Sequence, residues 1–256
     1  MKKITFIGNG NMAQAIISGL LKSSYEIEVI GRDINKLEAL KKQMPQITIG
    51  LFTAGFDITN KDVIFSVKPF NLIEVGAKLT GSANTLYSVL AGTTIESLKK
   101  NISANSYIRT MPNVSAKFLK SMTTLTGNAN SKDKSIDIFN CIGTTLWVDT
   151  ENELDIATAV AGSGPAFLAH FADGIIAGGV KSGLKEEDAI TLTQGLFDGF
   201  IPLLSDDKPK DIITKVMSPN GTTEAGYNYL VKNNVKEEIS NTIQTAYNRA
   251  LELAKN

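Results

Sequence analysis

A short glycine-containing segment near the amino terminus has the residue spacing of an anion-binding turn. The segment 8–13, GNGNMA, directly follows the apolar run Lys3–Ile7 and opens a helical pattern over Asn11–Leu21. In such a turn the first glycine permits the bend, the second lets a diphosphate approach the backbone, and a small third residue lets the helix pack on the strand. Free N–H groups at the helix start would hold the diphosphate of a dinucleotide. The residues expected to contact it are Gly8, Asn9, Gly10, Asn11, Met12 and Ala13.

The end of the second expected strand, Glu26–Ile30, selects between NAD and NADP. An acidic residue there would bind the 2′-hydroxyl of the adenine ribose, whereas an arginine would pair with the 2′-phosphate of NADP. Arg32 is placed to cover that phosphate, and Asp33 is placed to cap the helix expected over Asn35–Met44. In the alternative, Arg32 is a solvated loop residue and Asp33 binds the ribose. The sequence favours NADP, with NADPH preferred and acceptance of NADH left open.

Three further expected strands end in turns that contain proline or glycine. Asp62–Val67 runs into Lys-Pro, Thr85–Ala91 into Gly-Thr, and Tyr107–Thr110 into Met-Pro-Asn. The carboxyl ends of parallel strands share one edge of a sheet, where open α/β sheets bind ligands. Each turn alone could be an ordinary turn, but together they outline a groove for the nicotinamide end of the cofactor. The residues expected to contact the cofactor here are Val67, Lys68, Pro69, Ala91, Gly92, Met111, Pro112 and Asn113.

A second candidate anion site lies in the carboxyl-terminal half. The run Ser218–Thr223, SPNGTT, precedes a helical pattern that starts at Glu224. Hydroxyl groups and backbone N–H groups at a helix start form a ready site for an anion such as a carboxylate. The alternative is a plain helix cap by Thr222 or Thr223 with no ligand.

These motifs require a scaffold that places strand ends and helix starts together. Apolar runs alternate with helical patterns up to about residue 150, and the runs 62–67 and 85–91 are continuously apolar, which is typical of parallel strands covered on both faces. Further short strands are expected at Met122–Leu125 and Thr145–Val148. After Asp149 every long segment has a helical pattern. The sequence therefore predicts an α/β Rossmann-type domain with a mostly parallel sheet over 1–150, followed by an all-α domain over 151–256.

The helical half carries more apolar surface than a domain of its size usually buries alone. The segment Ala166–Val180 is apolar on nearly all sides, and such a helix must be buried in a domain or subunit interface. Two further helices carry apolar stripes, which run through Ala189, Ile190, Thr193, Leu196, Phe197, Phe200, Ile201 and Leu204 and through Val235, Ile239, Ile243, Ala246, Ala250 and Leu253. We therefore expect the protein to be at least a dimer.

Composition argues against several classes of function. Lys+Arg and Asp+Glu both number 26 in 256 residues, so the formal net charge is zero and neither nucleic acid nor an anionic membrane is an expected partner. The single cysteine, Cys141, and the single histidine, His170, exclude an intrachain disulfide and a His-rich metal cluster, and no metal site is expected. The apolar run 165–180 is too short to cross a bilayer. A cytoplasmic location is expected.

Taken together and in order, the motifs resemble those of pyrroline-5-carboxylate reductases. The similar segments are FIGNGNMAQAI, SVKP, LAGTT, RTMPN, AGSGPAF, DGIIAGGVKSGL and SPNGTTEAG, and they span essentially the whole chain. The resemblance implies NADPH-dependent reduction of 1-pyrroline-5-carboxylate to L-proline, the last step of proline synthesis. It also implies dimers formed through the helical domain and often assembled into decamers, with the active site completed across the dimer.

The resemblance also implies roles for the loop 218–223. Its backbone N–H groups and hydroxyls would bind the substrate carboxylate, and the Thr223 hydroxyl would reach the ring nitrogen, which makes it the catalytic candidate. The implied substrate-binding residues are Ser218, Asn220, Gly221, Thr222 and Thr223. The chain departs from the family pattern where Asn220 replaces a glycine, where Lys210 and Thr214 replace Gly and Asp, and where Ala54 replaces an Asn near the adenosine. Asparagine tolerates the left-handed backbone conformation better than most residues.

Other functions remain open at this point. Related imine reductases form one alternative. The β-hydroxyacid dehydrogenases have a similar two-domain plan, but they carry a lysine in a GxGxxxK arrangement, where this chain has Leu168 and no lysine from Gly162 to Val180. Alcohol oxidation needs a general base, and His170 is better explained as an ordinary helix residue. A non-catalytic NADP-binding protein is the last alternative, and the intact loop 218–223 argues against it.

Overall fold

The computed structural model describes residues 2–254, and the contacts within it divide the chain into two compact units. The first unit runs to Ser163 and includes the segment from Ala246 onward, and the second unit is Gly164–Thr245. The contacts therefore keep residues 151–163 with the first unit, whereas the change in sequence pattern falls near residue 150.

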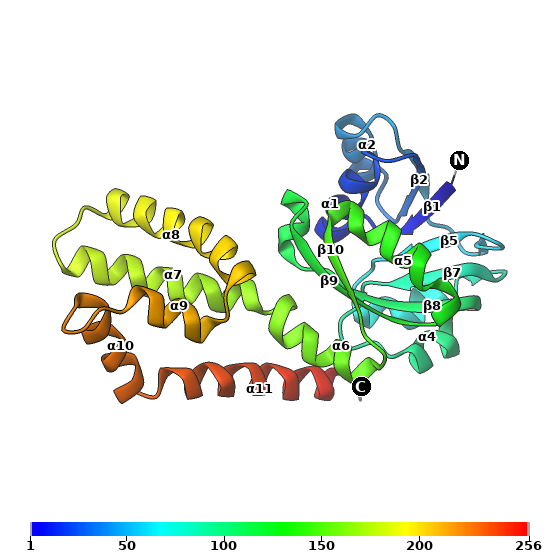
Figure 1. The fold of residues 1–256 in the computed structure, drawn as a ribbon. Helices are drawn as coiled ribbons and strands as arrows, with labels where there is room; N and C mark the ends of the chain where they lie inside the picture. Colours follow the sequence, from blue (N-terminus) through cyan, green and yellow to red (C-terminus); the bar gives the residue numbers. More distant parts are fainter. Residues whose placement is uncertain (1, 255–256) are drawn as a thin grey trace. The chain divides into compact units, whose positions relative to one another are not determined.

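An eight-stranded sheet forms the centre of the first unit (Figure 1). Its strand order is β10-β9-β8-β7-β5-β1-β2-β3, and the strands from β8 to β3 all run parallel. Strand β9 runs antiparallel to β8, and β10 runs parallel to β9. The strands are β1 Lys2–Ile7, β2 Tyr25–Gly31, β3 Thr48–Leu51, β5 Asp62–Phe65, β7 Ala83–Ser88, β8 Ala104–Met111, β9 Ser121–Gly127 and β10 Gly143–Trp147, with β4 Phe56–Asp57 and β6 Leu79–Thr80 paired separately. The expectation of a mostly parallel sheet is confirmed.

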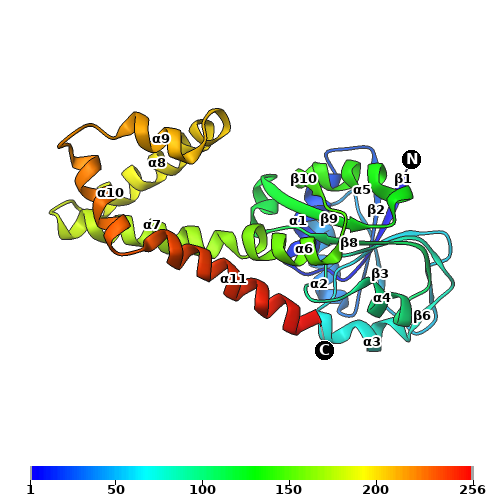
Figure 2. The ribbon, with the colours of Figure 1, turned by 60° about the horizontal axis from the view of Figure 1, so that its bottom comes forward.

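Helices cover both faces of this sheet (Figure 2). On β5, Ile64 packs in one apolar cluster and its neighbours Val63 and Phe65 pack in the other, because successive side chains of a strand point to opposite faces. The first cluster contains residues of α1 Asn11–Leu20, α2 Ile34–Gln43 and α5 Lys132–Phe139, and the second contains residues of α3 Leu72–Gly76 and α4 Ile95–Asn101. Two covered faces explain why this strand is continuously apolar.

A buried arginine connects the sheet to the helix that follows β10. Arg109 lies on β8 and is 1% exposed. Its Nη1 donates to Glu151 Oε1 at 2.9 Å, and its Nη2 donates to Asp155 Oδ1 at 2.8 Å. Both carboxylates belong to α6, Glu151–Ala157, which continues into a π-helical turn over Thr158–Gly162. The end of β8 therefore holds α6 in place.

The last turns of α11, Val235–Ala254, also pack on the first unit. Tyr247 Oη donates to Asn152 Oδ1 at 2.5 Å. Gly92 has φ +67°, and a Cβ atom there would lie 2.7 Å from Leu253 Cβ. Glycine is therefore required at this strand end by the backbone conformation and by the contact with α11.

The second unit is entirely helical, as expected. It contains α7 Gly164–Lys181, α8 Glu186–Asp206, α9 Pro209–Val216, α10 Thr222–Lys232 and the first part of α11. Along α7 no described residue is buried, although the helix is apolar on nearly all sides. Exposed large apolar side chains of this unit include Leu168, Phe171, Ile175, Val180, Leu192, Leu196, Ile201 and Tyr229. A single chain therefore leaves a broad apolar surface uncovered.

The ion pairs of Arg109 with Glu151 and Asp155 are expected to stabilise the packing of α6 on the sheet. In Asp155→Ala the buried guanidinium loses one of its two carboxylates, so we expect the free energy of unfolding to fall by about 3 kcal/mol. Urea denaturation followed by circular dichroism measures the change. Glu96→Ala removes the exposed i,i+4 pair with Lys100 and is the matched control, with little expected effect. Equal, small losses in the two variants would contradict this role of Arg109.

Candidate functional site

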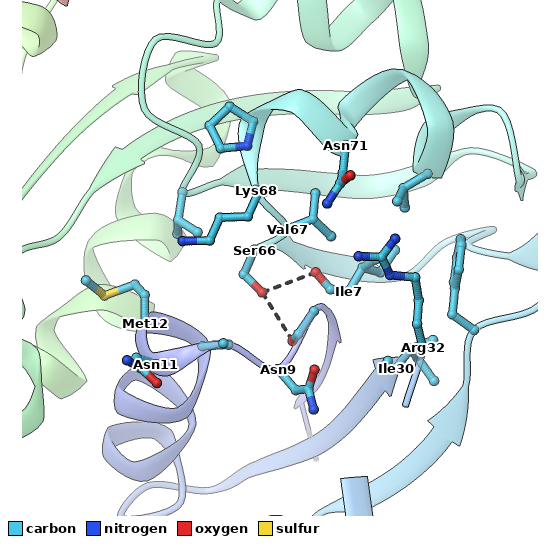
Figure 3. Close-up of a pocket in the computed structure, with 18 of the residues that line it drawn as sticks. Ile7, Asn9, Asn11, Met12, Ile30, Arg32, Ser66, Val67, Lys68 and Asn71 are labelled. Atoms are coloured by element: carbon cyan, nitrogen blue, oxygen red, sulfur yellow. Dashed lines mark hydrogen bonds between the residues drawn. The ribbon is translucent and has the colours of Figure 1, made fainter. Parts of the chain in front are cut away.

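A cavity of about 750 Å³ opens at the carboxyl ends of β1, β2, β5 and β7 (Figure 3). Most of the residues that were predicted from the sequence to bind a cofactor lie together in this cavity. The assigned residues that line the cavity are Gly8, Asn9, Gly10, Asn11, Met12, Ala13, Arg32, Val67, Lys68, Pro69 and Ala91. Gly92, Met111, Pro112 and Asn113 lie at the ends of the neighbouring strands but do not line this cavity.

The turn between β1 and α1 is built on Gly8 and on a serine that the sequence reasoning missed. Gly8 has φ +110°, and a Cβ atom there would lie 2.8 Å from Ser66 O. The Ser66 hydroxyl lies 3.1 Å from Ile7 O and 3.2 Å from Gly8 O and donates to these carbonyls (Figure 3). A polar residue at the end of an otherwise apolar run was the available signal. The backbone of the turn is thereby packed directly on the end of β5.

Gly10 differs from Gly8, because nothing in the protein demands a glycine there. It is the N-cap of α1, with φ −71° and ψ 177°, and a Cβ atom would meet nothing within 4 Å. No side chain caps the helix, and its first turn has no acidic residue, so its first N–H groups remain available. Ala13 is 1% exposed and packs in the core, as the third position of the motif requires. The geometry suits an anion that approaches Gly10.

Two cationic side chains line the cavity near the end of β2. Arg32 follows β2, and Lys36, which was not assigned from the sequence, stands one helical turn later on α2. Asp33 caps α2 by accepting from Lys36 N at 3.2 Å, which confirms the expected N-cap. The Asp33 carboxylate is therefore engaged at the helix start and does not line the cavity. Lys36 Nζ lies 3.9 Å from Asp33 Oδ2, an exposed pair, and no carboxylate of the described residues lines the cavity beside the two cations. This setting favours a phosphate over a ribose hydroxyl.

Arg32 has one weak partner in the structure. Its Nη1 lies 3.9 Å from Glu74 Oε2, and both side chains are more than half exposed, at 60% and 51%. The hydrogen bond from Lys78 and its positive charge, more than Arg32, hold the pKa of Glu74 below its ordinary value. An exposed pair at this distance contributes little, so Arg32 is available to a ligand.

The loop 218–223 lies in the second unit and opens α10. Gly221 N donates to Ser218 O at 3.0 Å, and Asn220 has φ +58°, the left-handed conformation that asparagine tolerates. Gly221 is the N-cap and has no side-chain cap, so the plain cap by Thr222 or Thr223 is not formed. Asn220 N donates to Glu224 Oε2 at 2.6 Å. The N–H groups of Thr222 and Thr223, in the first helical turn, are left for an anion.

Residues 2–254 contain no group of three His, Cys, Asp or Glu side chains arranged to hold a metal ion. No helix among them combines the length and apolar character needed to cross a membrane. His170 is exposed on α7.

Two family models match the chain in separate regions. Residues 151–253 match a model described as pyrroline-5-carboxylate reductase dimerisation. Residues 3–92 match a model described as NADP oxidoreductase coenzyme F420-dependent.

Full-length relatives and solved structures agree with these matches. A pyrroline-5-carboxylate reductase of Helicobacter pylori is 32% identical and covers 92% of this chain and 94% of its own length. One from Synechocystis is 31% identical and covers 99% of this chain and 98% of its own. The structure of a pyrroline-5-carboxylate reductase from Coxiella burnetii superposes with a TM-score of 0.87 at 28% identity, covering 99% of this chain and 98% of that one.

The contrast between Gly8 and Gly10 yields a prediction. Gly10→Ala should fold like the native chain, because the added methyl meets open space, yet bind a dinucleotide at least tenfold more weakly, because the methyl takes the ligand's place. Gly8→Ala should lower the thermal midpoint, because it strains the backbone and meets Ser66. Thermal unfolding and calorimetric titration with NADP⁺ separate the two effects. Unchanged binding in Gly10→Ala would show that no diphosphate approaches this residue.

Proposed function

Because the chain belongs to the pyrroline-5-carboxylate reductase family, we propose that it reduces 1-pyrroline-5-carboxylate to L-proline with NADPH. The observation that carries the proposal is a pair of helix starts without side-chain caps, at α1 beside the cavity and at α10 beside the loop 218–223. Each offers backbone donors to an anion, one to the diphosphate of a dinucleotide and the other to the carboxylate of an amino-acid-like substrate.

The proposed cofactor is NADP, held in the cavity of the first unit. The diphosphate would lie on the turn 8–13, and the 2′-phosphate would lie between Arg32 and Lys36. Val67, Lys68, Pro69 and Ala91 would contact the cofactor along the strand ends. Gly92, Met111 and Pro112 would border its nicotinamide end, because β7 and β8 end at the same edge. When bound, the cofactor supplies the hydride.

The substrate requires positioning more than acid–base chemistry. A protonated imine is already electrophilic, so the protein has to hold the carboxylate and place the imine carbon near the nicotinamide. In the loop 218–223, Asn220 N is bonded to Glu224 and Gly221 N to Ser218 O, which leaves the N–H groups of Thr222 and Thr223 for the carboxylate. Ser218, Asn220 and Gly221 would shape the loop, and the Thr223 hydroxyl would orient the ring nitrogen. Candidate acid–base pairs are not needed for this reaction.

We propose that the active form is a homodimer joined through the helical domain 151–256. The support is α7, an apolar helix without a buried residue along its described length. A helix of this composition needs a partner surface, and a second copy of the chain provides an identical one. Assembly into decamers and a cytoplasmic location rest on the family alone. The domain 1–150 would carry the cofactor.

Arg32→Ala tests the cofactor assignment. Loss of a charge-assisted contact should raise the KM for NADPH about tenfold and leave the KM for NADH nearly unchanged, because NADH has no 2′-phosphate. The measurement is the loss of NADPH absorbance on adding 1-pyrroline-5-carboxylate, with 2-hydroxy acids and NADP⁺ as the comparison reaction. Lys100→Ala, on an exposed lysine outside the cavity, is the control. Equal losses with both cofactors would remove the phosphate role, and no substrate-dependent oxidation in the native chain would refute the function.

Thr223 gives a second test, at the substrate end. Thr223→Val keeps the shape of the side chain and removes the hydroxyl, so kcat should fall about tenfold or more while NADP⁺ binding stays the same. Thr223→Ser keeps the hydroxyl and should retain most of the activity. Steady-state kinetics and fluorescence titration with NADPH measure the two quantities. Similar kcat values for the Val and Ser variants would mean that the hydroxyl does not act on the ring nitrogen.

A further inference from the structure

The backbone between α6 and α7 contains a carbonyl group that lacks the usual α-helical partner and accepts a hydrogen bond from outside its helix. In an α-helix the carbonyl of one residue accepts from the N–H four residues later. For Ala161 that residue is Pro165, which has no N–H. Ala161 lies in the π-helical turn Thr158–Gly162, where Ser163 N donates to Thr158 O at 2.9 Å. Ala161 is half-buried, and its carbonyl takes a donor from a side chain that is distant in sequence.

Asn113 supplies this donor. Its Nδ2 donates to Ala161 O at 3.0 Å, and its Oδ1 accepts from Ser115 N at 3.0 Å, which caps the 3-10 turn Val114–Phe118. Its backbone N–H donates to Ser121 Oγ at 3.1 Å. The residue is 9% exposed. Both ends of the amide are thus engaged by the protein, and the side chain holds two turns together.

The position of this bond connects it with the cofactor edge of the sheet. Asn113 follows β8, and a Cβ atom at Gly162 would lie 3.8 Å from Met111 Cγ, so the π-helical turn packs against the end of that strand. Arg109, earlier on the same strand, binds α6 through Glu151 and Asp155. Strand β8 and the residue pair after it therefore anchor the segment 151–162 at two places, through the ion pairs of Arg109 and through the Asn113 amide.

We propose that Asn113 is a positioning residue for the reaction: it fixes the turn 158–162, where the chain leaves the first unit, and does not bind the cofactor through its side chain. This inference rests on the proposed function, because the reaction that Asn113 would affect is the proposed imine reduction. Residues after the turn begin the helical domain that carries the loop 218–223. Since hydride transfer depends on placement to within about 1 Å, a loosened turn lowers turnover without weakening the cofactor.

One substitution separates the two bonds of the Asn113 side chain. Asn113→Asp keeps an oxygen that caps Ser115 N and removes the donor to Ala161 O. Asn128→Asp is the matched control, because it adds the same charge and keeps the oxygen that accepts from Tyr107 N at 2.8 Å. The readouts are hydrogen–deuterium exchange of peptides within 156–168, calorimetric binding of NADP⁺, and steady-state kinetics with 1-pyrroline-5-carboxylate.

The expected result is specific to Asn113→Asp. Exchange within 156–168 rises, kcat/KM for the imine falls about tenfold, and the Kd for NADP⁺ changes less than twofold, because the turn loosens while the cavity keeps its residues. Asn128→Asp resembles the native chain in all three measurements. Adding Pro165→Ala to Asn113→Asp returns a backbone N–H to the helix and restores part of the lost kcat/KM.

Each contrary result overturns a named part of the inference. Unchanged exchange would show that the Asn113 amide does not hold the turn. Faster exchange with unchanged kcat/KM would make the bond structural only. Weaker NADP⁺ binding in Asn113→Asp alone would make Asn113 a cofactor contact. If the native chain shows no imine turnover, the proposed function and the effect on the reaction fail together, and exchange still decides whether the turn is held.

Discussion

The bend at Gly8 is the constraint on which the cofactor site depends. Its positive φ and the close approach of Ser66 place the first turn of α1 directly against the end of β5. The helix start then faces the cavity without a side-chain cap, and Gly10 leaves the space in front of it open. Any side chain at Gly8 would strain the turn and press on the Ser66 backbone, because a Cβ atom would lie 2.8 Å from Ser66 O. Arg32 and Lys36 extend an anion site that this bend creates.

In the proposed sites, backbone donors contribute more to anion binding than charged side chains do. The formal net charge is zero, and the two helix starts concerned, at Gly10 and Gly221, are capped by glycines without side-chain bonds. At both, the N–H groups that a capping side chain would otherwise satisfy would be available to a ligand. This arrangement suits a reaction whose substrate and cofactor bring their own reactivity. The protein would then contribute placement, and the hydroxyl groups and backbone donors of the loop 218–223 fit that task.

Local patterns predicted the parts of the structure that depend on neighbours in sequence. The apolar run of β5 indicated a strand covered on both faces, and Asp33 was predicted as the cap of α2, because both signals lie within a few residues. Strand β3 was missed because it is a short, half-exposed edge strand that contains a glycine. Lys36 was not assigned from spacing, because its place in the cavity lining depends on the register of α2. The bond from Asn113 to Ala161 joins residues that are distant in sequence, so no local pattern indicates it.

The apolar surface of the helical unit would couple association to folding in the proposed dimer. A helix that is apolar all round, such as α7, is stable only when its whole surface is removed from water, yet none of its described residues is buried by the single chain. A second copy would cover exposed side chains such as Leu168 and Ile175. The burial of apolar surface that other domains obtain from their own core would then come from the partner chain. The loop at Gly221 belongs to the same unit. Its geometry would then depend on the assembled form, and the placement that hydride transfer requires would be a property of the assembly.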